Sequence, residues 1–214
     1  MTATILDRFD YAMAPKEVVS GCPLCGIRQA SHPATDRFGW TIGVSTCRHC
    51  AITYLNPRLT AEGYAAFYQD GYRQAIRAHR PEYTPELMRR GQHRMGVTYG
   101  RMSRQAGVSF DGRILDVGGS TGEFALGLGC TPARTTILDV SIEELAHAAG
   151  VGFTTICGRA EDLDPAARYD GVLCVQTIDH LTDPLTMLRR VQQALTPGGW
   201  FYVDMVDHLC WCSA

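Results

Sequence analysis

Long apolar runs are absent from this chain of 214 residues. No uninterrupted apolar stretch approaches the roughly 20 residues that a membrane-spanning helix needs. The N-terminal segment carries Asp7 and Asp10 where a secretion signal would have a basic start and an apolar stretch. The 45% apolar and 20% charged residues are close to the globular average, which argues against a disordered, collagenous or coiled-coil chain. We therefore expect a folded protein that stays in the cytoplasm and has no membrane partner.

Lysine is almost absent, since Lys16 is the only one in the chain. Residues 1–107 carry 14 Lys and Arg residues against 8 Asp and Glu residues, a net charge of +6, whereas residues 108–214 carry 6 against 14, a net charge of -8. This asymmetry predicts two modules. Arginines between residues 73 and 104 either grip an anionic group through their guanidinium forks or form a solvated helical face. They are Arg73, Arg77, Arg80, Arg89, Arg90, Arg94, Arg101 and Arg104.

A disulfide framework is also missing, because the nine cysteines are odd in number and no secretion signal accompanies them. Two Cys-x-x-Cys pairs, separated by 21 residues, comprise Cys22, Cys25, Cys47 and Cys50. Each pair makes a tight turn that aims two thiolates at one point, and the spacing is close to that of zinc ribbons, so we expect a closed structural zinc site. A redox motif is the alternative for a single pair, but it requires a helix N-terminus after a strand. His49 is an alternative ligand.

The pattern of the chain predicts three segments, and no internal repeat is visible. Short strands at 38–46 and 51–55 flank the second cysteine pair. Farther along, Thr60 caps a helix over 61–69, and another helix opens at Thr84. The segments are a zinc-ribbon-like module (1–58), a helical connector (59–107) and an α/β domain (108–214).

From residue 112 onward, strands and helices alternate along the chain. Such alternation predicts a parallel sheet wrapped by helices, which is an α/β fold. We expect strands at 113–117, 135–139, 153–157, 170–175 and 199–206, and helices at 122–128, 141–149 and 184–195.

A glycine-rich turn at residues 118–122 follows the first of these strands, which contains Asp116. Asp139 lies 23 residues after Asp116, at the tip of the next strand. Glycines let backbone amides approach a ligand closely, and an acidic residue at the second strand's tip can take both ribose hydroxyls. The arrangement predicts a nucleoside-binding site formed by Asp116, Gly118, Gly119, Gly122 and Asp139.

A dinucleotide suits this turn poorly. Counted from Gly118, the fingerprint G-x-G-x-x-G needs glycines where the chain has Ser120 and Glu123. A carboxylate at position 123 would repel a pyrophosphate at the helix N-terminus. S-adenosylmethionine has no phosphate and carries a sulfonium and an ammonium group, so acidic residues beside the loop favour it. We therefore expect S-adenosylmethionine as the cofactor.

Several segments occur in an order that is typical of one enzyme family. They read Ile114-Leu-Asp-Val-Gly-Gly-Ser-Thr-Gly122, Ile137-Leu-Asp139, Gly158-Arg-Ala160-Glu161-Asp-Leu163, Tyr169-Asp-Gly-Val-Leu-Cys-Val175, Ile178-Asp-His180-Leu-Thr-Asp-Pro184 and Leu195-Thr-Pro-Gly-Gly-Trp200. Together they resemble class I S-adenosylmethionine-dependent methyltransferases over residues 113–206. The resemblance implies a Rossmann-like, doubly wound, mostly parallel sheet with strand order 3-2-1-4-5. It implies that the cofactor contacts Asp116, Gly118, Gly119, Gly122, Asp139, Ala160, Glu161 and Gln176.

The N-terminal part carries a second resemblance. The segments Cys47-Arg-His-Cys50, Leu55-Asn-Pro-Arg58 and Phe67-Tyr-Gln-Asp-Gly-Tyr72 are similar to the zinc-binding segment that precedes the methyltransferase domain in a bacterial subfamily that includes sugar C-methyltransferases. The resemblance implies that residues 60–107 cover the cofactor cleft. It places Tyr68 and Tyr72 near the methionine end, so Tyr72 joins the expected cofactor contacts.

Two features depart from the family pattern. Ser120 replaces the third glycine of the commonest first motif, which preserves a small residue in the turn but loosens its contact with the methionine moiety. Family members continue past the fifth strand with a helix and a strand pair, whereas this chain ends at Ala214. We therefore expect a truncated domain without the closing strands, whose exposed sheet edge favours homo-oligomers.

The expected catalytic residues follow the fourth strand. Methyl transfer is an in-line displacement, so positioning dominates, and a base is needed only where the nucleophile must lose a proton. His180 is the expected base, since the unperturbed pKa of histidine, about 6.5, suits proton removal at neutral pH, and Asp179 orients it. Alternatively, His180 caps or braces the following helix while Asp179 faces solvent.

The preferred hypothesis is a methyltransferase that acts on an anionic small molecule, such as a nucleotide-activated sugar or a natural-product intermediate. The alternative is a cofactor-binding or interaction protein without turnover because of the short C-terminus. Delivery of methylation to RNA by the ribbon is disfavoured by the net charge, by the few aromatic residues between the arginines and by the absence of a basic tail. We therefore expect no nucleic-acid partner.

Overall fold

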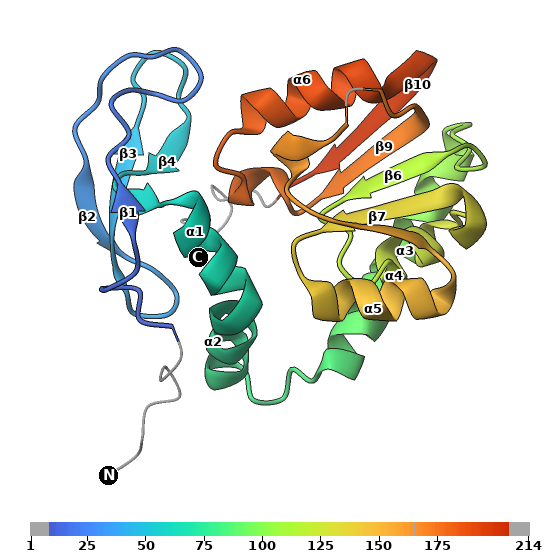
Figure 1. Cartoon of the computed structure of the whole chain (residues 1–214), viewed down its shortest axis with the longest axis horizontal. Helices are drawn as coiled ribbons and strands as arrows, with labels where there is room; N and C mark the ends of the chain where they lie inside the picture. The colour runs from blue at the N-terminus through green and yellow to red at the C-terminus, as the bar shows by residue number, and fades with distance from the viewer. Residues whose placement is uncertain (1–8, 165, 206–214) are drawn as a thin grey trace. The chain divides into compact units, whose positions relative to one another are not determined.

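The computed structural model describes residues 9–164 and 166–205 and divides the chain into two compact units (Figure 1). Unit 1 comprises residues 1–84, and unit 2 comprises residues 85–214. The boundary falls inside the 59–107 segment, so the helices expected to form one connector belong to different units. The expectation of a short C-terminus concerns residues 206–214, which lie outside the described residues.

Unit 1 contains two small antiparallel sheets followed by helical turns. The first sheet has the order β2-β3-β4, and in the second β1 pairs with β5. Thr60 starts the helical part, because its side chain accepts a hydrogen bond from the backbone N–H of Gly63 at 3.2 Å, as predicted. The elements are β1 (Lys16–Glu17), β2 (His32–Thr35), β3 (Thr41–Thr46), β4 (Thr53–Leu55), β5 (Arg58–Leu59), α1 (Ala61–Ala66), a π-helical turn (Phe67–Gly71) and α2 (Tyr72–His79).

Aromatic side chains form the core of unit 1. Phe9 and Tyr11 are buried there together with Leu59. Tyr11 stacks on Trp40 with ring centroids 5.1 Å apart, and Phe67 contacts Trp40 edge-on at 6.0 Å. Because aromatic pairs contribute beyond their buried area, this cluster supplies a core to a unit with little regular structure.

Unit 2 is an α/β domain with a parallel five-stranded sheet, which confirms the predicted fold class. The strands lie in the order β10-β9-β6-β7-β8. Numbered along the chain, this order is 3-2-1-4-5 when it is read from β8. The strands are β6 (Ile114–Val117), β7 (Thr135–Asp139), β8 (Thr154–Cys157), β9 (Tyr169–Val175) and β10 (Leu195–Asp204).

Helices cover both faces of this sheet, with α3, α4 and α5 on one face and α6 on the other (Figure 1). The predicted helices at 122–128, 141–149 and 184–195 are present with small shifts of their ends. The helices are α3 (Pro85–Gln105), α4 (Glu123–Leu128), α5 (Ile142–Val151) and α6 (Pro184–Ala194), with single 3-10 turns at η2 (Pro132–Arg134), η3 (Ala160–Asp162) and η4 (Ile178–His180).

Helix α3 packs against α4 through glycines. A Cβ atom at Gly96 would lie 2.2 Å from the carbonyl oxygen of Phe124, and one at Gly100 would lie 2.6 Å from that of Leu128. In return, a Cβ atom at Gly127 would lie 2.2 Å from the carbonyl oxygen of His93. The two helices therefore touch backbone to backbone, and α3 is fixed beside the loop that precedes α4.

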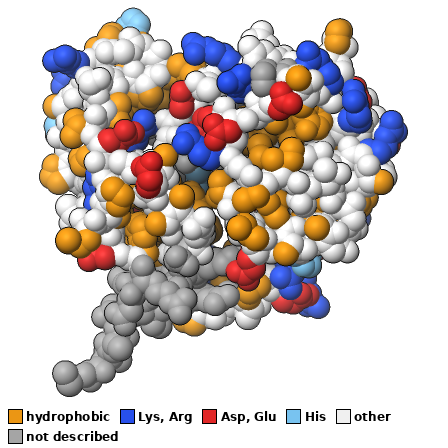
Figure 2. All heavy atoms as spheres, viewed as in Figure 1, with side chains coloured by type: hydrophobic (Ala, Val, Ile, Leu, Met, Phe, Trp, Pro, Cys, Tyr) orange, Lys and Arg blue, Asp and Glu red, His pale blue; other side chains and the backbone are white. Residues whose placement is uncertain are grey.

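On the face drawn in Figure 2, charged side chains of both signs are mixed with apolar side chains. Among the arginines for which either an anion-binding role or a solvated helical face was considered, Arg89 and Arg90 both pair with Glu86, at 2.9 and 3.0 Å. Arg104 donates to the carbonyl oxygen of Leu128 at 3.3 Å.

None of the described helices combines the length and the apolar character that a membrane span requires.

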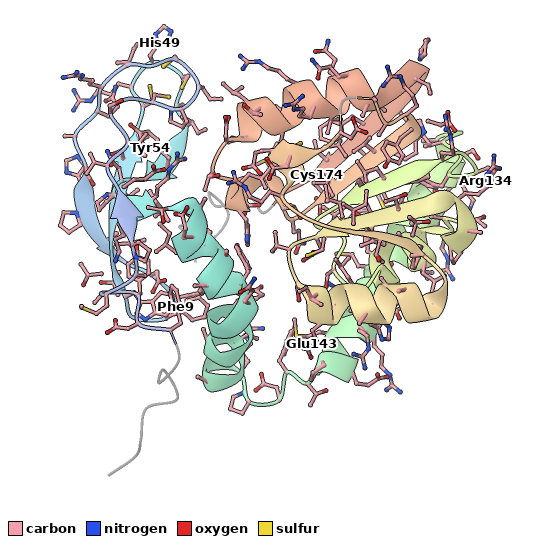
Figure 3. The ribbon with its side chains drawn as sticks, in the orientation of Figure 1. Phe9, His49, Tyr54, Arg134, Glu143 and Cys174 are labelled. Atoms are coloured by element: carbon pink, nitrogen blue, oxygen red, sulfur yellow. The ribbon has the colours of Figure 1, made fainter. Side chains whose placement is uncertain are left out.

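Alternating residues of the central strands supply the two cores of unit 2. Ile114 and Leu173 are fully buried on the side of α3, α4 and α5, whereas Leu115 and Val172 are fully buried on the side of α6. Cys174, on β9, belongs to the α6-side core (Figure 3). Its buried thiol serves as a small apolar side chain.

Candidate functional site

The loop from β6 to α4 follows the predicted glycine pattern. Gly118 has a φ of 69° and Gly122 a φ of 76°, in the left-handed region that favours glycine. A Cβ atom at Gly118 would lie 2.4 Å from Oγ1 of Thr177, and one at Gly119 would lie 2.7 Å from Cγ of Asp116. The loop therefore passes close to the ends of β6 and β9 and leaves no room for larger side chains.

Asp116 is the buried carboxyl group of this site. It is 2% exposed, and no described residue forms a hydrogen bond with its Oδ2 atom. Burial, together with the negative charge of Asp139, raises the pKa of Asp116 to about 7. A positively charged ligand placed beside it would favour its ionised form. The orphaned oxygen thus fits a cationic group such as a sulfonium or an ammonium.

Asp139 ends β7, and backbone donors fix its carboxylate. The N–H of Ser141 donates to Oδ1 at 2.9 Å, and the N–H of Ser120 donates to Oδ2 at 2.9 Å. Each carboxylate oxygen has two lone pairs, so each can accept a further hydrogen bond. The carboxylate is therefore held in a fixed orientation and can still accept hydrogen bonds from two neighbouring hydroxyl groups of a ligand.

Glu161 links the turn after β8 to the segment after β9. Its Oε1 atom accepts hydrogen bonds from Oγ1 of Thr182 at 3.0 Å and from the backbone N–H of Asp183 at 3.3 Å. Burial raises the pKa of Glu161, but hydrogen bonds from its own backbone N–H, from Thr182 and from Arg159 outweigh this effect, and the pKa is lowered. Ala160, which is buried in the same turn, was predicted together with Glu161 to contact the cofactor.

The predicted catalytic pair lies in η4, just after β9. Nε2 of His180 is 3.4 Å from Oδ2 of Asp179, so the two side chains contact each other as the hypothesis of a base and its orienting carboxylate requires. Gln176 precedes this turn with a φ of 50°, and its backbone N–H donates to the carbonyl oxygen of Asp204 at 2.7 Å. A non-glycine residue in this conformation is typical of strained functional positions.

The predicted residues of unit 2 all lie at or just after the carboxyl ends of parallel strands, from β6 to β9. In open α/β sheets this edge is where ligands bind. Tyr72 is the exception among the expected cofactor contacts, because it lies in α2 of unit 1. Its role, like those of His180 and Asp179, stays a prediction.

Sequence reasoning missed the partners of Glu123, the first residue of α4. Its Oε2 atom lies 3.1 Å from Nδ1 of His93 on α3, and its Oε1 atom lies 3.4 Å from Nε2 of His147 on α5. These side chains line an open depression together with Glu86, Arg89 and Arg90. The histidines are distant from Glu123 in the sequence and share no motif with it, so no sequence signal could have revealed the cluster.

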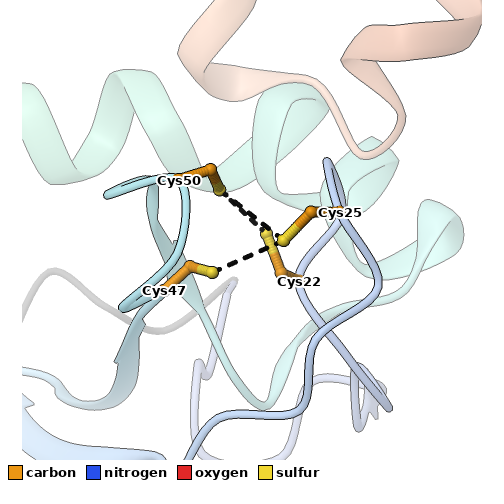
Figure 4. A group of neighbouring side chains, drawn as sticks. All are labelled: Cys22, Cys25, Cys47 and Cys50. Carbon is orange, nitrogen blue, oxygen red and sulfur yellow. Dashed lines mark hydrogen bonds between the residues drawn. The ribbon is translucent and has the colours of Figure 1, made fainter.

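The four predicted metal ligands converge in unit 1. The Sγ atoms of Cys22, Cys25, Cys47 and Cys50 all lie within 4.8 Å of one another (Figure 4). The sulfurs of Cys22 and Cys50 are 3.4 Å apart, and those of Cys25 and Cys47 are 3.5 Å apart. Four thiolates around one zinc ion at 2.3 Å sit about 3.8 Å apart at the corners of a tetrahedron. The donor set fits zinc, and His49 is not part of it.

Backbone donors support the thiolate of one member of this cluster, Cys47. The N–H groups of Cys50 and His49 donate to the sulfur of Cys47 and are the main reason why its pKa is lowered to about 6. The side-chain amide of Gln29 also points at this sulfur, at 3.9 Å. Metal ligation requires deprotonated cysteines, so these contacts favour the ligating form of Cys47.

Unit 2 is an α/β domain with a glycine loop at the carboxyl edge of its sheet, and the comparison with known families shows to which class it belongs. Residues 75–210 match the model of the family described as a methyltransferase domain. This match covers more than half of the chain, so the chain belongs to the methyltransferase domain family.

The individual proteins that match are described as methyltransferases. A ubiquinone biosynthesis O-methyltransferase from Marinobacter nauticus is 30% identical over 105 residues, which is 44% of each chain. Another, from Leptothrix cholodnii, is 26% identical over 135 residues, covering 58% of this chain and 57% of the relative. Among solved structures, a protein from Thermotoga maritima described as an S-adenosylmethionine-dependent methyltransferase is 26% identical, covers 54% of each chain and has a TM-score of 0.44. The chain spans about half the length of the curated relatives it matches.

Proposed function

We propose that this protein binds S-adenosylmethionine and transfers its methyl group to a small molecule. The observation that carries the proposal is Asp116, a buried carboxyl group with an orphaned oxygen beside a glycine loop at the carboxyl edge of a parallel sheet. Membership of the methyltransferase domain family supports the same cofactor. When bound, S-adenosylmethionine supplies an electrophilic methyl group on a positively charged sulfur.

Different residues of unit 2 would contact different parts of such a cofactor. The backbone of Gly118, Gly119 and Gly122 forms the cradle, and the Asp116 carboxylate balances positive charge. Asp139, already oriented by two N–H donors, accepts the ribose hydroxyls. Further contacts are proposed for Ala160, Glu161, Gln176 and Tyr72.

His180 is the proposed base. Its Nε2 atom lies 3.4 Å from Oδ2 of Asp179, which orients the ring. The pair is placed after β9, on the same sheet edge as the glycine loop and Asp139. In-line methyl transfer depends mainly on alignment, so a base is needed only when the acceptor must lose a proton. We propose that His180 acts as the base for acceptors of that kind.

An anionic small molecule is the proposed acceptor, either a nucleotide-activated sugar or a natural-product intermediate. The relatives that match are named for O-methylation in ubiquinone biosynthesis, so hydroxyl-bearing small molecules belong among the acceptors to be tried. The alternative, a cofactor-binding or interaction protein without turnover, applies if the cofactor binds and no acceptor is turned over.

A structural zinc ion is proposed for unit 1. Four cysteine sulfurs at near-tetrahedral spacing, each within one of two tight turns, give a closed site with no open position for substrate. The ion would therefore hold the unit together and take no part in the methyl transfer.

Calorimetric titration with S-adenosylmethionine and S-adenosylhomocysteine tests the cofactor assignment. We expect micromolar binding of both by the intact chain, and we expect Asp139→Ala to abolish it, because the substitution removes the ribose acceptor. Metal content, measured on the same samples, should show one zinc ion per chain in both proteins. No binding by a folded, zinc-loaded protein would overturn the cofactor assignment and favour an interaction protein.

A further inference from the structure

We propose that Ser120 and Glu144 act as a positioning pair that holds the cofactor-binding loop against Asp139. The proposal rests on the proposed function, because it explains how this chain shapes the same site. It assigns a role to the serine that replaces a glycine of the family motif, and to a glutamate that no sequence motif had singled out.

The backbone of Ser120 makes the pair necessary. Its φ is 53°, in the left-handed region that is uncommon for residues with a Cβ atom. Glycine would adopt this conformation without strain. A serine at this position therefore needs compensating contacts in order to keep the loop in its observed shape.

Two hydrogen bonds provide this compensation. The hydroxyl of Ser120 donates to Oε2 of Glu144 at 2.8 Å, and Glu144 is only 8% exposed. The backbone N–H of the same serine donates to Oδ2 of Asp139 at 2.9 Å. Hydrogen bonds to carboxylates are stronger than neutral ones, and partial burial of the acceptor strengthens them further.

Ser141 closes these contacts into a ring. Its backbone N–H donates to Oδ1 of Asp139 at 2.9 Å, and its hydroxyl accepts from the backbone N–H of Glu144 at 3.4 Å. The ring thus joins the glycine loop, the end of β7 and the first turn of α5. Without the serine hydroxyl, the loop would keep its backbone hydrogen bonds to β7, from residue 120 to Asp139 and from Gly118 to Leu138, but it would lose its side-chain contact with α5. The carboxylate of Asp139 would then lose part of its fixed orientation.

The variant Ser120→Gly tests whether the serine hydroxyl positions the loop or whether the turn only requires a small residue. The substitution relieves the left-handed backbone but removes the hydroxyl, so we expect S-adenosylmethionine to bind about tenfold more weakly, in line with the loss of one charge-assisted hydrogen bond. In the cofactor-free protein, we also expect the amide of residue 120 to exchange with deuterium at least several-fold faster. Unchanged or tighter binding together with unchanged exchange would overturn the pair.

Variants of Glu144 test the other half of the pair. Glu144→Gln keeps an oxygen acceptor and should retain most of the affinity and protection, whereas Glu144→Ala should lose both about as much as Ser120→Gly. The combined variant Ser120→Gly with Glu144→Ala should add little to either single change, because both remove the same bond. Additive losses would show that the two residues act separately and would overturn the proposal.

Glu143→Ala is the matched control. Glu143 occupies the same first turn of α5 and carries the same charge, but its side chain is exposed (Figure 3). We expect it to leave amide exchange in the loop unchanged. If the unaltered protein bound no S-adenosylmethionine, the proposed function would fail, while the exchange measurements would still decide whether the pair holds the loop.

Discussion

Asp116 shows most directly how burial changes the chemistry of a single side chain. Its pKa is raised from 3.8 to about 7 by burial and by the negative charge of Asp139. In the folded protein, this group therefore holds its proton at pH values where the unfolded chain has lost it. A cation bound beside the buried carboxyl group would favour its ionised form and pair with it.

Stability should reflect this shift. Between about pH 4 and pH 7 the folded state binds more protons at Asp116 than the unfolded state, so this group's contribution to the free energy of unfolding falls as the pH rises and is lost above about pH 7. Urea denaturation from pH 4 to pH 8 measures it. The free energy of unfolding of the unaltered protein minus that of Asp116→Asn should decrease across this range.

Asp162→Asn, at an exposed position, controls for the removal of one carboxylate. A difference that increased with pH for Asp116→Asn would contradict the assignment, because it would mean that the folded state favours the ionised carboxyl group. Both variants should be compared in the absence of cofactor, since a bound cation would change the pKa of Asp116.

At the scale of elements, the sequence predicted what periodicity can reveal. The strands and helices after residue 112 alternate clearly, because each has one or two buried faces and a turn at its end. Strand β2 was missed because all of its residues are exposed, so it has no apolar alternation. The helix over 61–69 continues instead as a π-helical turn from Phe67, which no propensity rule marks in advance.

The candidate site was predictable where residues are close in sequence or belong to a motif. The glycine loop, Asp116 and the two cysteine pairs follow local spacing, and the structure places them as that spacing indicated. The contacts of Glu123 with His93 and His147, and of Ser120 with Glu144, join residues from different helices. Such pairs arise from packing, which a single sequence does not encode in any fixed interval.

Packing of α3 on α4 gives a prediction at the same scale. Gly96→Ala should destabilise the protein by about 1–3 kcal/mol or more, because the new Cβ atom would lie 2.2 Å from a backbone oxygen of α4 and backbone cannot move aside cheaply. Thermal and urea denaturation would measure the loss.

Gly91→Ala supplies the internal comparison on the same helix. Nothing lies within 4 Å of a Cβ atom at Gly91, so alanine there should stabilise the protein by up to about 1 kcal/mol through its higher helix propensity. Equal effects of the two substitutions would show that the contact between α3 and α4 is looser than described.

At the scale of the whole molecule, the two units have different sources of stability. Unit 1 has a small aromatic core and a cysteine cluster, whereas unit 2 has a sheet with a core on each face. Within the described residues, β8 and β10 form the edges of that sheet, and self-association through such an edge stays a prediction.

Removal of the proposed zinc ion should unfold one unit and leave the other folded. A chelator is expected to unfold unit 1, because the four thiolates would lose the zinc ion that is proposed to join them, while the sheet of unit 2 stays largely folded. Hydrogen exchange resolved along the chain would show loss of protection in residues 9–84 and its retention in the strands of unit 2.

Two cysteine variants refine this experiment. Cys47→Ser, within the cluster, should reproduce the effect of the chelator, and Cys157→Ser, at an exposed cysteine outside the cluster, should not. Cooperative unfolding of the entire chain on metal loss would contradict the separation of the units.

The glycine contact between α3 and α4 also affects how genetic variation in this protein should be interpreted. Gly96, Gly100 and Gly127 have no functional group, yet almost any replacement would force two backbones apart. In a saturation mutagenesis survey they would tolerate as little change as the four clustered cysteines. Intolerance at these positions would report an architectural constraint, and a map of the active site drawn from mutational sensitivity alone would include them by mistake.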